Sequence, residues 1–233
     1  DKVCDDALLS LRNLKETRFF LWVHFYDPHH PYESPRGADP GSPEAYADEV
    51  SFVDAQIGRL MAGLKAEGLH RNTMVVVVGD HGEGLGEHGE SEHGYFVYET
   101  TMHVPLLIWR PGTVPAGRVV EGETRTIDLL PTILDYLGQP PILQAQGTSL
   151  RPLILKPQDA DLTGYGEALS PKTVLGLSPL RCVYRGTWKY ILAPRPELYD
   201  MARDPGEKGN LISTKPEVAS DLRGQLQELL ARA

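Results

Sequence analysis

Apolar runs and helical apolar periodicities alternate along the first 140 residues of the chain. Continuous apolar runs at Phe19–Phe25 (FFLWVHF), Thr73–Val78 and Val104–Trp109 predict buried strands. Apolar residues recur at helical spacing in Tyr46–Glu67 and in Ile127–Leu137, where they predict amphipathic helices. Strands that alternate with helices in this way are typical of an α/β domain, so we predict a largely parallel core sheet flanked by helices.

The pattern changes after about residue 139. A segment rich in proline and glycine, 138–159, predicts a connection across the surface. The stretch "LRCVYRGTWKYIL" predicts a β-hairpin around Gly186, "PELYDM" a third short strand, and the apolar positions after Pro216 a last helix. We therefore expect two domains: residues 1–140 form the α/β core, and residues 141–233 form the connection and a small antiparallel sheet plus helix.

Composition and charge narrow the classes of function. The chain has 233 residues and a formal net charge of −9, without a cluster of lysine and arginine, which argues against a nucleic-acid-binding surface. No apolar run reaches the length that crosses a membrane. The two cysteines, Cys4 and Cys182, are too few for a disulfide scaffold or a cysteine zinc site. An acidic protein can still bind an anion where a metal ion neutralises it locally.

Polar residues gather where two of the predicted strands end. The sequence "GDHG" places Asp80 and His81 directly after the second strand, and "DPHHP" places His29 and His30 after the first. Ligands of open α/β sheets bind beyond the carboxyl ends of the strands. A carboxylate next to an imidazole offers one hard and one borderline ligand to a divalent ion. Asp80 and His81 are therefore candidate metal ligands.

Each of these groups also has a purely structural interpretation. Asp80 could cap a turn at the strand end, and His29 and His30 could lie in a proline-flanked surface turn. His93, where the loop returns, could be a hydrogen-bonded structural histidine. We interpret His88, in the middle of the loop, as a solvated residue.

Four stretches in order along the chain resemble those of one enzyme family. The segment "VVVVGDHGEGLGEHGESEHGYFVYETTMHVPLLIWRPG" resembles the metal-site segment of sulfatases, in the alkaline phosphatase superfamily. "FFLWVHFYDPHHPY" resembles the family's strand and His-x-Pro loop, "IDLLPTILDYLGQP" with "GTSLRPLI" its helix and following turn, and "WKYILAPRPELYDMARDPGEKGNL" its C-terminal hairpin. The resemblance covers residues 17 to 212 and implies an alkaline-phosphatase-like fold. Residues 1–140 would then be the C-terminal part of the catalytic core and carry the metal-site loop.

The resemblance also implies roles for four residues. Asp80 matches the family's carboxylate metal ligand, and His81 matches the neighbouring ligand, which is asparagine in many sulfatases. His29 matches the histidine that contacts the sulfate or phosphate oxygens of the substrate. His93 falls where many relatives have a lysine that binds the same oxygens, and in a two-metal relative it would be a metal ligand instead. His29 and His93 are thus the expected catalytic residues, which stabilise these oxygens or protonate the leaving group.

The family's nucleophile is missing from these residues. It is a cysteine or serine in C/S-x-P-x-R, converted to formylglycine, or a threonine or serine in the phosphatase branch, and it lies upstream together with the first carboxylate pair on the metal. Cys4 and Cys182 stand in other contexts, and the chain starts at Asp1 within a predicted helix. We therefore expect a C-terminal half that does not turn over alone. We also expect it to pair with the upstream half of the same protein, or to self-associate if that half is absent.

The implied function is hydrolysis of a small-molecule or glycan sulfate ester with one divalent metal ion, Ca²⁺ or Mg²⁺. One alternative is a phosphodiester or phosphonate monoester hydrolase, or a phosphoryl-headgroup transferase, of the same superfamily. The imidazole of His81 would suit Mn²⁺ or Zn²⁺ in that branch. A second alternative is a non-catalytic binding or interaction module. The sequence does not determine the localisation, although the resemblance favours an extracytoplasmic protein, periplasmic or secreted.

Overall fold

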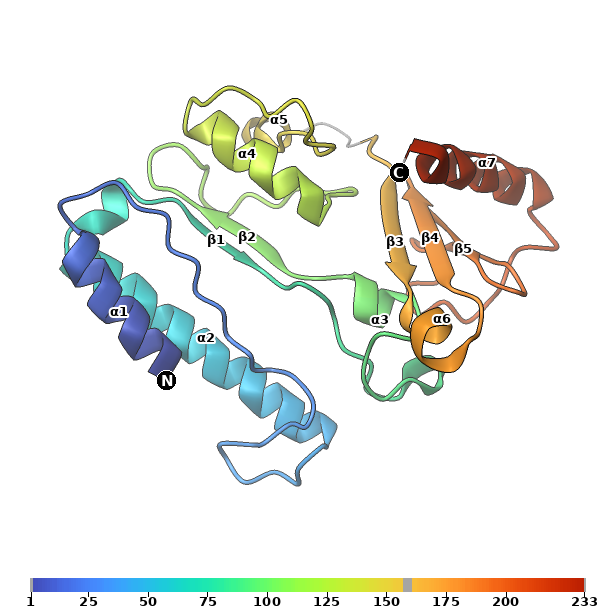
Figure 1. Ribbon diagram of the computed structural model, residues 1–233, viewed down its shortest axis with the longest axis horizontal. Helices are drawn as coiled ribbons and strands as arrows, with labels where there is room; N and C mark the ends of the chain where they lie inside the picture. The colour runs from blue at the N-terminus through green and yellow to red at the C-terminus, as the bar shows by residue number, and fades with distance from the viewer. Residues whose placement is uncertain (1, 157–160, 233) are drawn as a thin grey trace. The chain divides into compact units, whose positions relative to one another are not determined.

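The computed structural model describes residues 2–156 and 161–232, which form parts of two compact units (Figure 1). The first unit comprises Asp1–Val77 and Leu107–Val114, and the second comprises Val78–Leu106 and Pro115–Ala233. No helix in the described part is long and apolar enough to cross a membrane. The predicted domain boundary near residue 140 stays a prediction.

The first unit contains two helices that lie side by side, α1 (Lys2–Leu14) and α2 (Pro43–Ala66) (Figure 1). The side chain of Ser42 accepts a hydrogen bond from the backbone of the first turn of α2, and a proline at the first helical position favours the start of a helix there. The predicted helix Tyr46–Glu67 is therefore confirmed. A short 3₁₀ helix, η1 (Leu69–Arg71), follows it.

The strands of the first unit differ from the prediction. β1 (Val75–Val78) and β2 (Leu106–Trp109) form a two-stranded sheet. The backbone N–H of Gly79 donates to the carbonyl oxygen of Pro105, and that of Gly82 donates to the carbonyl oxygen of Thr101. Residue numbers therefore rise along one segment as they fall along the other, which is the pattern of an antiparallel pair. Residues 2–156 and 161–232 thus show no parallel sheet, and this part of the prediction is wrong for them; the pairs among β3, β4, β5 and β6 are antiparallel as well.

The segment Phe19–Phe25 is extended but is not a strand of any sheet in the described part of the chain. Phe20 is 80% exposed and Trp22 is 79% exposed, and His24 is also exposed. The prediction of a buried strand is therefore wrong here. An apolar run becomes a buried strand only where neighbouring strands take its backbone hydrogen bonds and layers cover its faces.

The second unit contains an antiparallel sheet in the order β3-β4-β5-β6. Its strands are β3 (Gly164–Ala168), β4 (Leu180–Arg185), β5 (Trp188–Leu192) and β6 (Glu197–Asp200). The hairpin between β4 and β5 turns at Gly186, whose φ of 57° favours glycine. The predicted hairpin and third strand are confirmed, whereas β3 was not predicted.

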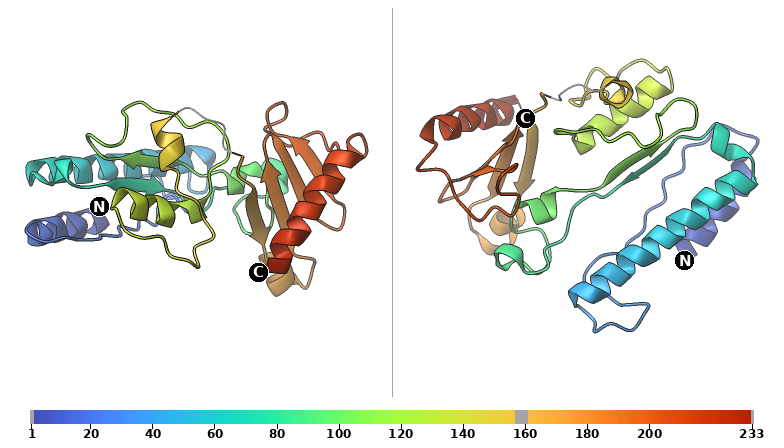
Figure 2. Two further views of the ribbon diagram at one scale, coloured as in Figure 1. Left: turned by 90° about the horizontal axis from the view of Figure 1, so that it is seen from above. Right: turned by 180° about the vertical axis from the view of Figure 1, so that it is seen from behind.

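Both faces of this sheet are covered within the second unit. α7 (Pro216–Arg232), the predicted last helix, packs on one face (Figure 2). The buried residues of that layer are Val183, Tyr190, Leu198, Ala219, Leu222 and Leu226. On the other face, Val97 and Met102 pack against Cys182, Tyr184 and Ile191. Met102 belongs to the short helix α3 (Glu99–Met102), so this face anchors the end of the loop that follows β1.

The connection after residue 138 is more buried than predicted. The helix Ile127–Leu137 is confirmed as η3 (Thr126–Asp128) and α4 (Leu129–Tyr136). The connection includes the short helix α5 (Arg151–Leu155), with Leu153 and Ile154 buried, so it does not simply cross the surface. Its last residues, 157–159, lie outside the described part. The unit also holds α6 (Ser170–Leu175) and η2 (Glu87–Gly89).

Candidate functional site

The loop that follows β1 contains, near its start, a glycine that packs directly on backbone, Gly82. A Cβ at Gly82 would overlap the carbonyl oxygen of Thr100 and lie 3.0 Å from its carbonyl carbon. The backbone N–H of Gly82 donates to the carbonyl oxygen of Thr101 over 2.8 Å. The two residues before Gly82, Asp80 and His81, are therefore held at a fixed distance from α3.

The imidazole of His81 is held by the backbone of its own turn. Its Nδ1 lies 2.8 Å from the carbonyl oxygen of Gly82, and a carbonyl oxygen only accepts, so Nδ1 carries the proton. Nε2 then has the lone pair, which a metal ligand requires. Beside it, the side chain of Asp80 is 80% exposed, and its Oδ2 lies 3.9 Å from His81 Nε2.

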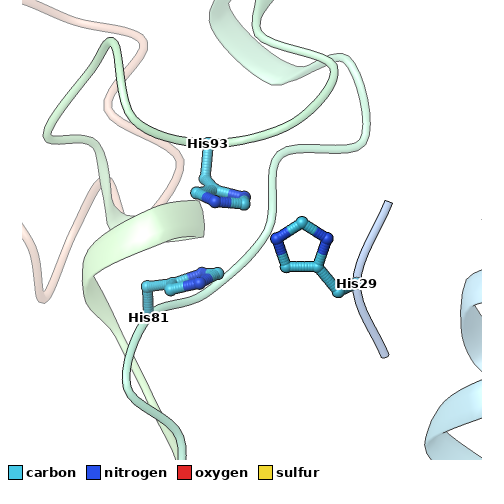
Figure 3. A group of neighbouring side chains, drawn as sticks. All are labelled: His29, His81 and His93. Atoms are coloured by element: carbon cyan, nitrogen blue, oxygen red, sulfur yellow. The ribbon is translucent and has the colours of Figure 1, made fainter. Parts of the chain in front are cut away.

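His93 comes from the returning part of the loop and stacks on His81 (Figure 3). The ring centroids are 3.9 Å apart and the planes differ by 26°. His93 Nδ1 lies 2.9 Å from Oε1 of Glu83, whose side chain is 3% exposed. A carboxylate that accepts from Nδ1 leaves Nε2 as the acceptor of the ring. One ring nitrogen of each histidine lies within 4.8 Å of one of the other, so both can serve one site.

Two buried glutamates that the sequence analysis missed organise this loop. Glu83 orients His93, and its second oxygen is buried without a hydrogen-bond partner in the described part of the chain. Glu90 is 6% exposed and accepts from the backbone N–H groups of Tyr95 and Phe96. The loop contains five glutamates between residues 83 and 99, and nothing local distinguishes these two from solvated ones. Burial by the rest of the fold makes the difference.

His88, predicted to be solvated, is exposed but not isolated. Its ring stacks on Tyr98, with centroids 3.7 Å apart and an angle of 13° between the planes. Its φ of 54° lies in the left-handed region that few residues other than glycine adopt, so the loop turns sharply at this point.

His29 belongs to the first unit. Its Nδ1 lies 2.6 Å from the carbonyl oxygen of His30, and its ring stacks on Tyr26. Glu49 of α2 is hydrogen-bonded to the residues that follow this loop. Its side chain is buried, with the residue 4% exposed, and its Oε1 accepts from the backbone N–H of Glu33 over 2.6 Å. Burial raises the pKa of the Glu49 carboxyl, although the hydrogen bond from Glu33 opposes the shift. Glu49 is another residue that the sequence analysis missed.

The structure thus brings three of the four predicted site residues together in the second unit: Asp80, His81 and His93. The fourth, His29, lies in the first unit, and its role stays a prediction.

The donor set in the second unit fits a divalent cation. Asp80 supplies an accessible carboxylate, and the protons on Nδ1 of His81 and His93 leave Nε2 of each ring as the acceptor. The second oxygen of Glu83, buried without a hydrogen-bond partner among residues 2–156 and 161–232, adds a polar group behind His93. Because Glu83 fixes the ring of His93 through Nδ1, the Nε2 of this ring is also placed for proton transfer with a bound ester.

Comparison with known proteins identifies the family. The family model described as "Sulfatase" matches residues 1–139, and the model described as "N-sulphoglucosamine sulphohydrolase, C-terminal" matches residues 86–232. Arylsulfatase K of Rattus norvegicus is 31% identical over 193 residues, a match that covers 76% of this chain and 33% of that protein. The chain therefore spans about a third of the length of this curated relative.

Solved structures share the fold. A protein named BT4656, in complex with its substrate D-glucosamine-2-N,6-O-disulfate, matches with a TM-score of 0.70 and 28% identity over 79% of this chain and 39% of its own. The phosphonate monoester hydrolase of Silicibacter pomeroyi matches with a TM-score of 0.65 and 31% identity over 81% of this chain and 40% of its own. The chain belongs to the sulfatase family of the alkaline phosphatase superfamily and covers part of the sulfatase fold.

Proposed function

We propose that this chain is the metal-binding part of a hydrolase that acts on a small-molecule or glycan sulfate ester. One observation carries the proposal: the stacked rings of His81 and His93 both have Nδ1 held by an acceptor, next to the exposed carboxylate of Asp80. Membership of the sulfatase family and likeness to a protein solved with a sulfated glucosamine support the choice of ester.

The roles follow from the chemistry of each group. Asp80 and His81 would hold one divalent ion, Ca²⁺ or Mg²⁺, and the ion would supply charge withdrawal from the transferring sulfuryl group. His93, oriented by Glu83 through Nδ1, exchanges a proton through Nε2 with an oxygen of the ester or of the leaving group. His29 is assigned a contact to the same oxygens on the family resemblance alone.

Covalent catalysis also needs a nucleophile, and these 233 residues lack one in the family's C/S-x-P-x-R pattern. We assign the nucleophile to another part of the protein, in keeping with a relative of which the match to this chain covers only 33%. The isolated chain is therefore expected to bind metal weakly and to hydrolyse nothing.

The test uses the native gene product, including any residues outside these 233, with 4-nitrophenyl sulfate as substrate. Asp80→Ala should lower kcat/KM at least about 100-fold, and metal removal followed by readdition should abolish and restore activity. Asp54→Ala, which removes an exposed carboxylate of α2, is the matched control and should leave kcat/KM unchanged. Equal activity of the two variants would refute the proposed metal site.

A second candidate keeps the site and changes the ester. The imidazole of His81 and the 31% identity to a phosphonate monoester hydrolase favour phosphonate or phosphodiester hydrolysis with Mn²⁺ or Zn²⁺. The ratio of kcat/KM on 4-nitrophenyl phenylphosphonate to that on 4-nitrophenyl sulfate decides between the two. A non-catalytic binding module is the remaining alternative, and it predicts a native protein that no divalent ion stabilises against heat.

A further inference from the structure

A lysine is completely buried in the centre of the small sheet of the second unit. Lys189 lies on β5, between Trp188 and Tyr190, and is 0% exposed. An unpaired ammonium at a buried position would be very unfavourable. The groups that pair with Lys189 therefore indicate the role of this lysine.

The partners come from two distant segments. Nζ of Lys189 lies 2.6 Å from Oε1 of Glu207 and 3.5 Å from Oε2 of Glu99, and it lies 4.9 Å from the centre of the ring of Tyr184. The hydroxyl of Tyr184 donates to the same oxygen of Glu99 over 3.2 Å. Burial raises the pKa of Glu207, which shows that desolvation of the carboxylate outweighs the attraction of the lysine.

The second oxygen of Glu207 holds the start of α3. It accepts from the backbone N–H of Glu99 over 2.6 Å, and the residue before Glu99 provides no side-chain cap of its own. Glu207 itself has a φ of 51°, in the left-handed region. A strained non-glycine residue persists only where its surroundings determine its conformation. The surrounding structure therefore holds Glu207 in the conformation that places its carboxylate at the start of α3.

The other end of α3 holds the loop of the candidate site. The carbonyl oxygen of Thr101 accepts from Gly82, which packs on the backbone of α3 without room for a Cβ. Next to Gly82 stands His81, and on His81 stacks His93. A continuous set of contacts therefore runs from Lys189 through α3 to the two histidines.

We propose that Lys189 is a positioning residue: through Glu207 and Glu99 it fixes α3, and α3 fixes the loop that presents His81 and His93. The ammonium does not touch the site. This inference rests on the proposed function only for its consequence on metal binding, because the orientation of the two rings can be measured without activity.

The test compares Lys189→Met and Glu207→Gln with Lys215→Met, which removes an exposed lysine before α7. The readouts are the ring ¹H–¹³C signals of His81 and His93, assigned with His81→Gln and His93→Gln, and the affinity for Mn²⁺ alone. Both network variants should shift or broaden the two ring signals and weaken Mn²⁺ binding about ten-fold, whereas the control should do neither.

Unchanged ring signals and Mn²⁺ affinity in a cooperatively unfolding network variant would overturn the inference. If Lys189→Met does not fold, Glu207→Gln decides, since glutamine keeps the volume and the acceptor for the N–H of Glu99. Loss of folding in both would also overturn it, because the pair would then hold the whole unit and not the loop. A native gene product that binds none of Ca²⁺, Mg²⁺ and Mn²⁺ would refute the proposed function, while the ring signals would still decide this inference.

Discussion

The close approach of Gly82 to α3 makes the smallest possible substitution informative. An added Cβ would overlap the carbonyl oxygen of Thr100 and lie 3.0 Å from its carbonyl carbon and 3.1 Å from the Cα of Thr101. Ordinary van der Waals contacts between carbon atoms are about 3.5–4.0 Å, so the loop and α3 must separate. Separation also weakens the hydrogen bond from Gly82 to Thr101. We expect Gly82→Ala to lower the free energy of unfolding by about 1–3 kcal/mol, the usual cost of overpacking.

The matched control is Gly224→Ala in α7, where a new Cβ meets no atom within 4 Å. Replacing glycine by alanine inside a helix should stabilise the protein by about 0.5–1 kcal/mol, so the two identical chemical changes should have opposite signs. The assay is urea unfolding, together with the ring signals of His81 and His93. If Gly82→Ala proves as stable as Gly224→Ala, the loop is not held by this contact and the reasoning fails.

Three further predictions concern other parts of the molecule. Glu49→Gln should gain stability relative to wild type as pH rises above about 4.3, because burial raises the pKa of Glu49 and the ionised form is disfavoured in the folded state. Thermal melts from pH 4 to 7 test this, and a difference that does not change with pH would contradict it. Asp128→Ala should cost about 3–5 kcal/mol in urea unfolding, because it removes a fully buried carboxylate that pairs with Arg125 and accepts from Thr148. A loss below 1 kcal/mol would mean that this ion pair contributes little. Leu226→Ala, at the fully buried centre of the contact between α7 and the sheet, should cost about 2–5 kcal/mol, and a smaller loss in the same assay would mean that the layer repacks.

Local signals were sufficient for most helices and for the hairpin. The start of α2 has its serine cap and proline in the sequence, and the β4–β5 turn has the glycine that its φ of 57° favours. In contrast, β3 reads "GYGEA", in which two glycines weaken any strand prediction. It becomes a strand because β4 offers it a full antiparallel ladder. Phe19–Phe25 shows the converse, since a strong apolar run has no partner strand among the described residues.

In the candidate site, too, some residues could be predicted from the sequence and others could not. Asp80, His81 and His93 could be selected from the sequence because their types and their place after an apolar run match a family motif. The residues that orient these side chains could not be selected from the sequence. Glu83 is ten positions from His93, and Glu207 is 108 positions from Glu99, so no pattern of neighbours indicates either contact.

By itself, therefore, the sequence determined the family, the candidate ligands and the helices and turns that depend on nearby residues. Only the tertiary structure decided which glutamates are buried, that Lys189 faces inward, and which apolar runs are paired. The physical reason is that local conformation depends on dihedral preferences within a few residues, whereas burial and strand pairing depend on partners that only the folded chain brings together.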